Sequence, residues 1–319
     1  MDLNLSDPER IAAEKLIELA LAEDLQDMGD LTCRALIGED DRGEVQVVAR
    51  QRGVLAGAPV AEMVFARFDS EVRWQGHVGD GSRLEAGTVV ANVSGPLRSL
   101  LIGERTALNF LAHLSGVASL TGRFVNAVVG TPAKIFDTRK TLPGYRVLDK
   151  YAVRAGGGTN HRRGLYDGIL IKDNHLANWA ESAGGHTIAE AIRQARRSAP
   201  DGIPIEVEVD TIEQLADALT AAPDIVLLDN MDSSTLRQAV ELRNRVAPQV
   251  QLEASGGVTL QKVTETAATG VERISVGALT HSAPALDLGF DWKGHVSTTH
   301  LPNPAETDLN RECRGDDFR

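Results

Sequence analysis

The stretch IPIEVEVDTIEQLADALTAAPDIVLLDN (residues 203–230) contains two runs rich in β-branched and other apolar residues, with a helical segment between them. Two strands joined by a helix are typical of a parallel pair, which needs a long crossover connection. The same alternation continues in both directions, and six strands alternating with helices predict an α/β fold with about six parallel strands, closed or nearly closed into a barrel. The runs are AKIFDT (133–138), GILIKD (168–173), IPIEVEVD (203–210), DIVLLDN (224–230), VQLEASGG (250–257) and RISVGA (273–278).

The first part of the chain has a different sequence pattern. Residues 8–26 place apolar residues at helical spacing behind a proline, which predicts an amphipathic helix. Residues 43–95 contain alternating β-branched runs with one helical stretch at 58–67. We therefore expect a small α+β domain ahead of the barrel.

A long helical region at 97–129 connects the two parts, and we expect it to break near Gly116. It predicts an N-terminal domain at 1–117 and a barrel domain at 118–292. Residues 293–319 are polar and aperiodic, which favours a disordered C-terminal tail.

Charge is distributed unevenly along the chain. The formal net charge is −12, yet residues 134–175 hold nine Lys and Arg against four Asp and Glu. The overall negative charge argues against general attraction to nucleic acid or anionic membranes. A local cluster of positive charge in a cleft instead attracts a compact anion. The composition predicts a small polyanionic partner.

The N-terminus, MDLNLSDPER, is acidic and lacks the apolar core of a signal peptide. No apolar run is long enough to span a bilayer, so we expect a cytoplasmic protein. Cys33 and Cys313 lie near opposite ends of the chain, which favours neither a disulfide framework nor a zinc site.

Polar residues follow the predicted strands at their carboxyl ends, where barrel enzymes assemble their active sites. If the strands are parallel, these residues converge on one mouth. They are Arg139, Lys140, Lys172, Glu208, Asp229, Ser255, Gly256, Gly257 and Gly277.

Carboxylates at that mouth suit two kinds of partner. Glu208 and Asp229 can accept hydrogen bonds from ribose hydroxyls or lie near a magnesium ion carried by a phosphate. Glu206 faces the same side of its strand as Glu208, so it must be solvated, paired or functional.

Two glycine-containing turns, EASGG and SVGALTHS, follow the last two predicted strands. Glycines can simply turn the chain, but two such turns on adjacent strands favour a phosphate site built from backbone N–H groups.

The segment GGGTNHRRG (156–164) fits neither a P-loop nor a dinucleotide fingerprint. We interpret it as a mobile or tightly turned loop that presents His161 and Arg162. Arginine and lysine bind carboxylates and phosphates, so Arg139, Arg162 and Lys172 are the strongest cationic candidates. A solvated helix or loop face is expected for Arg146, Lys150, Arg154 and Arg163. The remaining histidines, including His113, His175, His186 and His281, share no metal-ligand spacing.

Together these segments resemble the quinolinate phosphoribosyltransferase family, also called carboxylating nicotinate-nucleotide pyrophosphorylase. The match is nearly continuous from about residue 100 to 291 and rests on DTRKT-x-PG, the GGG-x-NHR loop and LLDN in this order. The resemblance implies an N-terminal α/β sandwich domain, an incomplete α/β barrel, and a homodimer in which the sandwich of one subunit faces the barrel of the other. It also implies that quinolinate and phosphoribosyl pyrophosphate give nicotinate mononucleotide, pyrophosphate and carbon dioxide in de novo NAD biosynthesis, with Mg²⁺.

The resemblance also implies roles for individual residues. Quinolinate carboxylates would be bound by Arg139, His161, Arg162 and Lys172, with Arg105 from the neighbouring subunit. Lys140, Glu208 and Asp229 would bind phosphoribosyl pyrophosphate. Residues 255–257 (Ser255, Gly256, Gly257) and 275–277 (Ser275, Val276, Gly277) would surround its 5′-phosphate, and Arg50 would reach the phosphates. Thr138 belongs to the substrate site through the DTRKT motif, and the four catalytic candidates are Lys140, Lys172, Glu208 and Asp229.

Three alternatives stay open at this point. A related phosphoribosyltransferase-fold protein could use another aromatic acid or serve molybdenum transport. A Schiff-base aldolase could use Lys172 as its nucleophile, since a lysine at the end of a barrel strand suits that chemistry. A non-catalytic anion-binding protein would need the same cations without turnover.

Overall fold

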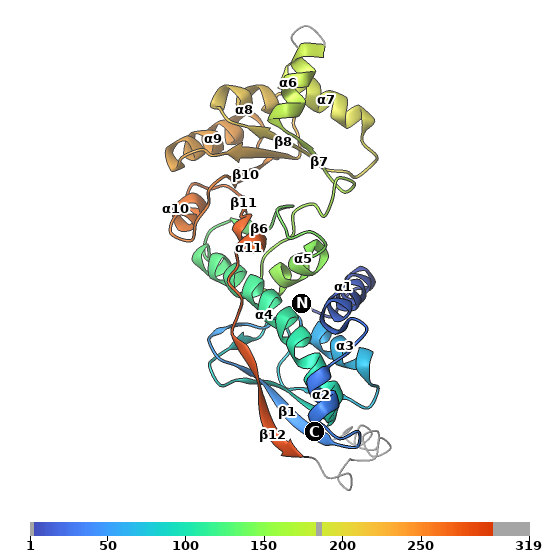
Figure 1. The fold of residues 1–319 in the computed structure, drawn as a ribbon. Coiled ribbons are helices and arrows are strands. Elements are labelled where there is room, and N and C mark those ends of the chain that lie inside the picture. The colour runs from blue at the N-terminus through green and yellow to red at the C-terminus, as the bar shows by residue number, and fades with distance from the viewer. Residues whose placement is uncertain (1–2, 183–186, 296–319) are drawn as a thin grey trace, which may run out of the picture.

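The computed structural model describes residues 3–182 and 187–295, which form an α/β barrel half and an α+β half connected by a long helix (Figure 1). The barrel half contains one parallel sheet in the order β6-β11-β10-β9-β8-β7. All six predicted strands are therefore confirmed. Their bounds are β6 (Lys134–Phe136), β7 (Ile169–Ile171), β8 (Ile205–Val209), β9 (Ile225–Asp229), β10 (Gln251–Ser255) and β11 (Arg273–Ser275).

The barrel is open between β6 and β7, the two edge strands of this sheet. The free edge of β6 is covered by the loop that follows the three glycines. Thr159 donates its N–H to the Ile135 carbonyl at 2.8 Å and accepts from the Asp137 N–H at 3.2 Å. This short parallel bridge satisfies backbone groups that an exposed edge strand would leave unpaired.

The glycines make this course possible. Helix α5 (Arg146–Ala155) ends at Gly156, and Gly157 adopts a left-handed φ of +84°. A Cβ atom on Gly156 would lie 2.4 Å from the Ala118 carbonyl oxygen, so only glycine lets the chain turn this close to the long helix. The expected tight turn is confirmed.

Helices connect the strands and cover the outer side of the sheet (Figure 1). The strand side chains that face outward to these helices, such as Val207, Val226 and Leu228, are fully buried. The helices are α6 (Asp173–Ser182), α7 (Ile188–Ser198), α8 (Ile212–Leu219), α9 (Ser233–Val246), α10 (Val263–Ala267) and α11 (Ala278–His281).

The N-terminal half is an antiparallel sheet packed against helices, in the order β12-β1-β5-β3. Its strands are β1 (Arg42–Ala49), β3 (Arg73–Gly76), β5 (Val89–Pro96) and β12 (Leu288–His295), beside a small β2–β4 pair (Gly53–Val54 and Arg83–Leu84). Its helices are α1 (Asp7–Leu25), α2 (Leu31–Leu36) and α3 (Ala58–Phe68), so the helices predicted at 8–26 and 58–67 are confirmed.

Strand β12 comes from the far end of the chain and returns to the N-terminal sheet beside β1 (Figure 1). The boundary predicted at residue 292 falls inside this strand, which short sequence patterns do not connect to a partner more than 200 residues earlier. Residues 296–319, most of the predicted tail, lie outside the described residues.

Helix α4 (Leu97–Ala127) runs between the two halves as a single unbroken helix of 31 residues. The break predicted near Gly116 is wrong, because the glycine serves packing instead. A Cβ atom there would lie 2.3 Å from the Pro284 carbonyl oxygen, so Gly116 lets the chain after α11 approach the helix. None of the described helices, α4 included, has the length and apolarity needed to cross a membrane.

Candidate active site

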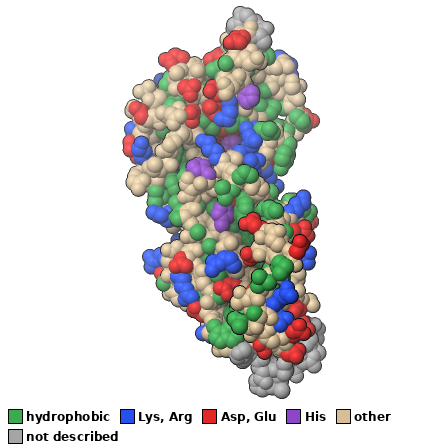
Figure 2. Space-filling view, in the orientation of Figure 1, with side chains coloured by type: hydrophobic (Ala, Val, Ile, Leu, Met, Phe, Trp, Pro, Cys, Tyr) green, Lys and Arg blue, Asp and Glu red, His purple; other side chains and the backbone are tan. Residues whose placement is uncertain are grey.

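The carboxyl ends of the barrel strands surround a cavity of about 470 Å³, which we call the mouth. It combines residues from the DTRK segment, the GGG-x-NHR loop and the ends of β7 to β11. Figure 2 shows Lys, Arg and His side chains gathered in the barrel half of the molecular surface. The mouth is lined by Thr138, Arg139, Lys140, His161, Arg162, Leu170, Lys172, Glu208, Leu227, Asp229, Glu253, Ser255 and Ser275.

Three cations of the mouth, Arg139, Lys140 and Arg162, form no ion pair within the described residues. The Nε atom of Arg139 is buried and has no hydrogen-bond partner there. Burial and the nearby charge of Arg139 lower the pKa of Arg162. Two guanidinium groups that repel each other and lack counter-ions form a site for an anion.

Lys172, which follows β7, forms an ion pair with Glu208 of the adjacent strand β8 at the edge of the mouth. Its side chain is 43% exposed and that of Glu208 is 14% exposed, so the pair faces the cavity. Asp229 of β9 accepts a hydrogen bond from the Asn230 amide at 2.7 Å, and Asn230 has a left-handed φ of +53°. Asparagine tolerates this conformation, which explains why the strand ends in Asp-Asn.

The two turns predicted to bind phosphate are partly separated. Ser255 lines both the mouth and a neighbouring cavity of about 430 Å³, whereas Gly256 and Gly257 line only the latter. Gly256 has a φ of +92°, and a Cβ atom on it would lie 2.2 Å from Asn230 Oδ1. The turn therefore requires glycine for its own geometry.

The second turn has mixed surroundings. Ser275 lines the mouth, while the Val276 side chain is buried and its N–H donates to the Phe136 carbonyl at 2.9 Å. Gly277 lies against Lys140, whose Cδ would be 3.2 Å from an added Cβ atom. Neither the side chain nor the N–H group of Val276 is therefore available to a ligand.

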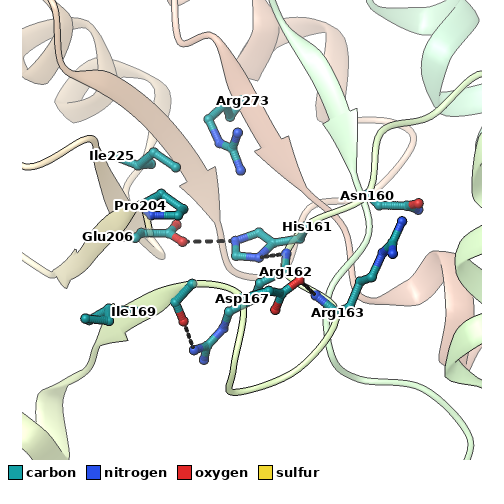
Figure 3. Close-up of a pocket in the computed structure, with 11 residues that line it drawn as sticks. Asn160, His161, Arg162, Arg163, Asp167, Ile169, Pro204, Glu206, Ile225 and Arg273 are labelled. Carbon is teal, nitrogen blue, oxygen red and sulfur yellow. Dashed lines mark hydrogen bonds and ion pairs between the residues drawn. The ribbon is translucent and has the colours of Figure 1, made fainter. Parts of the chain in front are cut away.

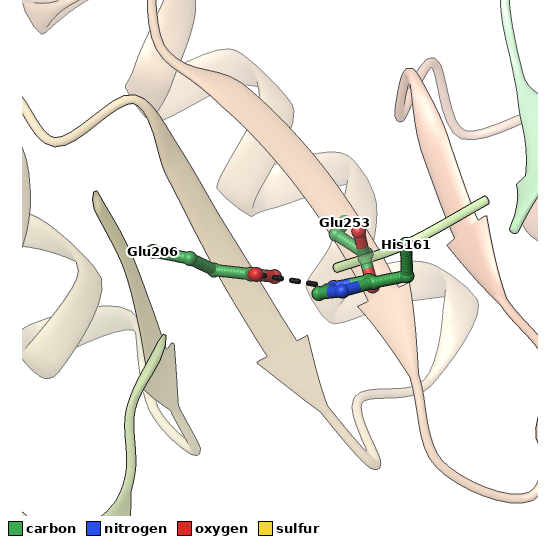
Figure 4. A group of neighbouring side chains, drawn as sticks. All are labelled: His161, Glu206 and Glu253. Carbon is green, nitrogen blue, oxygen red and sulfur yellow. Dashed lines mark ion pairs between the residues drawn. The ribbon is translucent and has the colours of Figure 1, made fainter. Parts of the chain in front are cut away.

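The floor of the mouth is formed by His161, which extends into the barrel interior between two carboxylates (Figure 4). Its Nε2 atom lies 3.1 Å from Glu206 Oε2 and 3.4 Å from Glu253 Oε1. Arg273 pairs with Glu253 at 2.6 Å and stacks on the Phe136 ring at 3.7 Å from its centroid. Of the three possibilities left open for Glu206, solvated, paired or functional, the structure shows that it is paired with His161. Glu253 and Arg273 were not predicted from the sequence. Their signal is the period-2 pattern that turns both side chains inward.

Lys150 was expected on a solvated face, and this expectation is wrong. Its side chain is 4% exposed and forms an ion pair with the fully buried Asp137. Burial raises the pKa of Asp137 and lowers that of Lys150. Asp137 also accepts from the His161 N–H at 2.8 Å, and Lys150 donates to the His161 carbonyl at 3.0 Å. The buried pair therefore holds the loop that carries His161.

Arg154 and Arg146 were also expected on a solvated face, and both are instead partly buried and bonded to other residues. Arg154 pairs with the buried Glu9 at 2.7 Å, which ties α5 to α1. Arg146 is partly buried and donates to the Arg139 carbonyl at 3.4 Å. Arg163 is exposed, as expected.

Arg105 lies away from the mouth of its own chain. It lines a separate cavity of about 200 Å³ together with residues of α1 and Tyr145. Arg50 also lies elsewhere, where it forms an ion pair with Asp291 of β12. His113 pairs with the buried Asp149 at 2.7 Å. His186 lies outside the described residues.

An open parallel barrel whose mouth gathers unpaired cations beside two carboxylates, with an α+β domain attached, defines a class of enzyme that acts on small polyanionic substrates. Family models of the quinolinate phosphoribosyl transferase N-terminal and C-terminal domains match residues 30–115 and 117–291. The chain belongs to the quinolinate phosphoribosyl transferase family.

Individual relatives cover almost the whole chain. The nicotinate-nucleotide pyrophosphorylase (carboxylating) of Mycobacterium leprae is 46% identical over 291 residues, which are 90% of this chain and 99% of that protein. A probable enzyme of the same name from Bacillus subtilis is 44% identical over 87% of this chain and 92% of its own. The crystal structure of NadC from Streptococcus pyogenes, 39% identical, superposes with a TM-score of 0.84 and covers 92% of this chain and 99% of that one.

Proposed function

We propose that this chain transfers the phosphoribosyl group of phosphoribosyl pyrophosphate to quinolinate with loss of carbon dioxide. The products are nicotinate mononucleotide and pyrophosphate, in de novo NAD biosynthesis. The observation that carries the proposal is the mouth, where Arg139 and Arg162 lie together, neither in an ion pair with a described residue, and where the buried Nε of Arg139 has no hydrogen-bond partner among those residues.

Quinolinate brings two carboxylates to these cations. Arginine binds a carboxylate in bidentate fashion, so Arg139 and Arg162 suit the carboxylate that the product retains. Tight cationic contacts would hinder departure of the other carboxylate. His161 and Lys172 complete the acceptor pocket, and Lys172 is already partly balanced by Glu208.

Phosphoribosyl pyrophosphate would lie across the strand ends beside quinolinate. Lys140 would bind its phosphates, while Glu208 and Asp229 accept hydrogen bonds from ribose hydroxyls. The turns at 255–257 and 275–277 would surround the 5′-phosphate with backbone N–H groups. Mg²⁺ would enter as part of this substrate, bound by its phosphate oxygens.

The reaction needs little covalent chemistry from the protein. The pyridine nitrogen attacks the anomeric carbon as pyrophosphate leaves, and positive charge develops on the ribose. Glu208 and Asp229 would stabilise that charge, and the mouth would contribute mainly by positioning. The positive charge on the pyridinium nitrogen of the adduct then stabilises the electron pair that stays on C2 when its carboxylate leaves as carbon dioxide.

A homodimer with shared active sites is part of the proposal. Arg105 lies outside the mouth of its own chain, which is what a residue serving a neighbouring subunit requires. Magnesium dependence and a cytoplasmic location also stay predictions. An aldolase is disfavoured, because a Schiff-base lysine must be a neutral amine and Lys172 is ion-paired with Glu208.

Calorimetry with quinolinate and nicotinate tests the acceptor assignment. We expect quinolinate to bind at least about tenfold more tightly, because a second charge-assisted contact contributes roughly 1.5–3 kcal/mol. Equal affinities for the two acids would contradict it and favour a relative that acts on another aromatic acid.

A further inference from the structure

A layer of ionisable side chains lies inside the barrel, directly beneath the mouth. It consists of His161, Glu206, Glu253 and Arg273, whose side chains are 9%, 4%, 0% and 13% exposed. Barrel interiors are normally filled by branched apolar residues, and burying charges is unfavourable. A layer of this kind next to the substrate cavity calls for a chemical role.

The charges of this layer balance only if it holds one extra proton. Two carboxylates and one guanidinium sum to −1, so a single proton on His161 or Glu206 makes the layer neutral. Arg273 already balances Glu253, which leaves too little negative charge for a divalent metal ion at the same place.

Two residues of the layer can carry this proton. Burial opposes a charge on His161, but hydrogen bonds to Glu206 and Glu253 raise its pKa to about 9. Burial raises the pKa of Glu206, whose Oε1 atom has no partner among the described residues. His161 Nδ1 accepts the Arg162 N–H at 2.8 Å, which favours the arrangement with the proton on Glu206. The other charged groups next to His161, Asp137 and Lys150, bind its backbone.

The layer separates two cavities. A second cavity of about 420 Å³ lies on the other side, at the amino ends of the strands, where Pro204, Ile225 and Arg273 contribute to its wall (Figure 3). Glu206 lines this amino-end cavity, and His161 lines both it and the mouth. The two residues therefore connect one cavity to the other through a single hydrogen bond.

We propose that Glu206 and His161 relay a proton from the amino-end cavity to the acceptor ring in the mouth. The proposal rests on the proposed function. When the bond between C2 and its carboxylate breaks, carbon dioxide leaves and the electron pair stays on C2. Glu206 passes its proton to His161 Nε2 while the proton already on Nε2 moves to C2 and forms the new C–H bond, so His161 stays neutral. Glu206 then regains a proton from solvent water in the amino-end cavity.

Two variants distinguish this relay from a structural role. Glu206→Gln keeps the shape of the side chain but cannot exchange a proton, whereas Glu206→Asp keeps the carboxyl group and shortens the side chain. Single-turnover formation of nicotinate mononucleotide is measured in H₂O and D₂O with quinolinate, phosphoribosyl pyrophosphate and Mg²⁺. Asp167→Asn, at another carboxylate of the same cavity, is the matched control.

We expect Glu206→Gln to slow product formation by about 100-fold, the usual contribution of a general acid, and to increase the solvent isotope effect. Glu206→Asp should recover most of the rate, and Asp167→Asn should keep the wild-type isotope effect. Quinolinate affinity should change less than about twofold in Glu206→Gln, since the glutamate does not contact substrate.

A Glu206→Gln rate equal to or above that of Glu206→Asp would overturn the relay. If Glu206→Gln does not fold, the rate of the wild-type chain is measured in mixtures of H₂O and D₂O. A curved dependence of the rate on the deuterium fraction supports the transfer of two protons. The absence of a solvent isotope effect overturns the relay. A wild-type chain without any turnover would instead contradict the proposed function, so the two failures are distinguishable.

Discussion

Among single residues, the mouth depends on two arginines, Arg139 and Arg162, that form no ion pair with any described residue. Arg139 and Arg162 repel each other, and the buried Nε of Arg139 donates to no described atom. An incoming carboxylate reduces the repulsion between the two guanidinium groups and also accepts a hydrogen bond from the Nε atom of Arg139. The binding energy of the acceptor is therefore concentrated in these two side chains.

Arg139→Ala should weaken quinolinate binding by about 100-fold, because truncating one partner of a buried charge-assisted pair is unfavourable by roughly 2–5 kcal/mol. Affinity for phosphoribosyl pyrophosphate should stay unchanged. Calorimetry with each substrate checks both statements, and Arg163→Ala, an exposed neighbouring arginine, is the control. Unchanged quinolinate affinity in Arg139→Ala would refute the assignment.

The buried layer also links stability to pH. The pKa of His161 is raised from 6.5 to about 9, so the folded chain binds more protons than the unfolded chain between these values. Its contribution to stability is complete below about pH 6.5 and is lost as the pH rises through about 9. Urea unfolding of the wild type should show this decrease, while His161→Gln should show a smaller one. If the free energy of unfolding changes with pH in the same way in both proteins, the layer does not hold an extra proton at His161 and Glu206.

Sequence patterns identify residues at strand ends better than residues inside the barrel. Arg139, Lys140, Lys172, Glu208 and Asp229 follow apolar runs, and the structure brings all of them to the mouth. Glu253 and Arg273 lie within the runs, where a charged residue has no visible partner until the barrel curvature brings strands together. Lys150 was misplaced for the same reason, since its partner Asp137 belongs to another element.

At the scale of elements, local periodicity predicts helices and strands but not their long-range pairing. The β-branched runs gave the six barrel strands, because each strand and its crossover helix are local in sequence. Strand β12 pairs with β1 across almost the whole chain, and no local signal specifies that register. The sequence around Gly116 was ambiguous in a similar way, because a glycine within a helical segment can indicate either a break in the helix or a close contact with another segment.

Gly116→Ala and Gly122→Ala separate these two meanings within α4. An added Cβ atom at Gly116 would lie 2.3 Å from the Pro284 carbonyl, whereas at Gly122 the nearest atom is 3.5 Å away. We expect Gly116→Ala to lower the free energy of unfolding by roughly 1–3 kcal/mol. Gly122→Ala should raise it by about 0.5–1 kcal/mol, because alanine favours the helix. Equal effects in urea titrations would show that Gly116 has no packing role.

At the scale of the whole molecule, the position of Arg105 outside the mouth suggests that one chain is not a complete enzyme. A subunit with Arg105→Ala and one with Lys172→Ala should each be inactive alone. Mixed and reassembled, they should recover about a quarter of wild-type activity, because half of the dimers are mixed and each keeps one intact site of two. No recovery in demonstrated heterodimers would place Arg105 in the site of its own chain.

Phosphoribosyl transfer to a dicarboxylate with decarboxylation can be followed in a single assay. The purified chain is incubated with phosphoribosyl pyrophosphate, Mg²⁺ and quinolinate labelled in its C2 carboxylate. We predict that nicotinate mononucleotide and labelled carbon dioxide form in equal amounts, and that nicotinate in place of quinolinate gives no nucleotide. Turnover of nicotinate, or nucleotide formed without release of the label, would contradict the account.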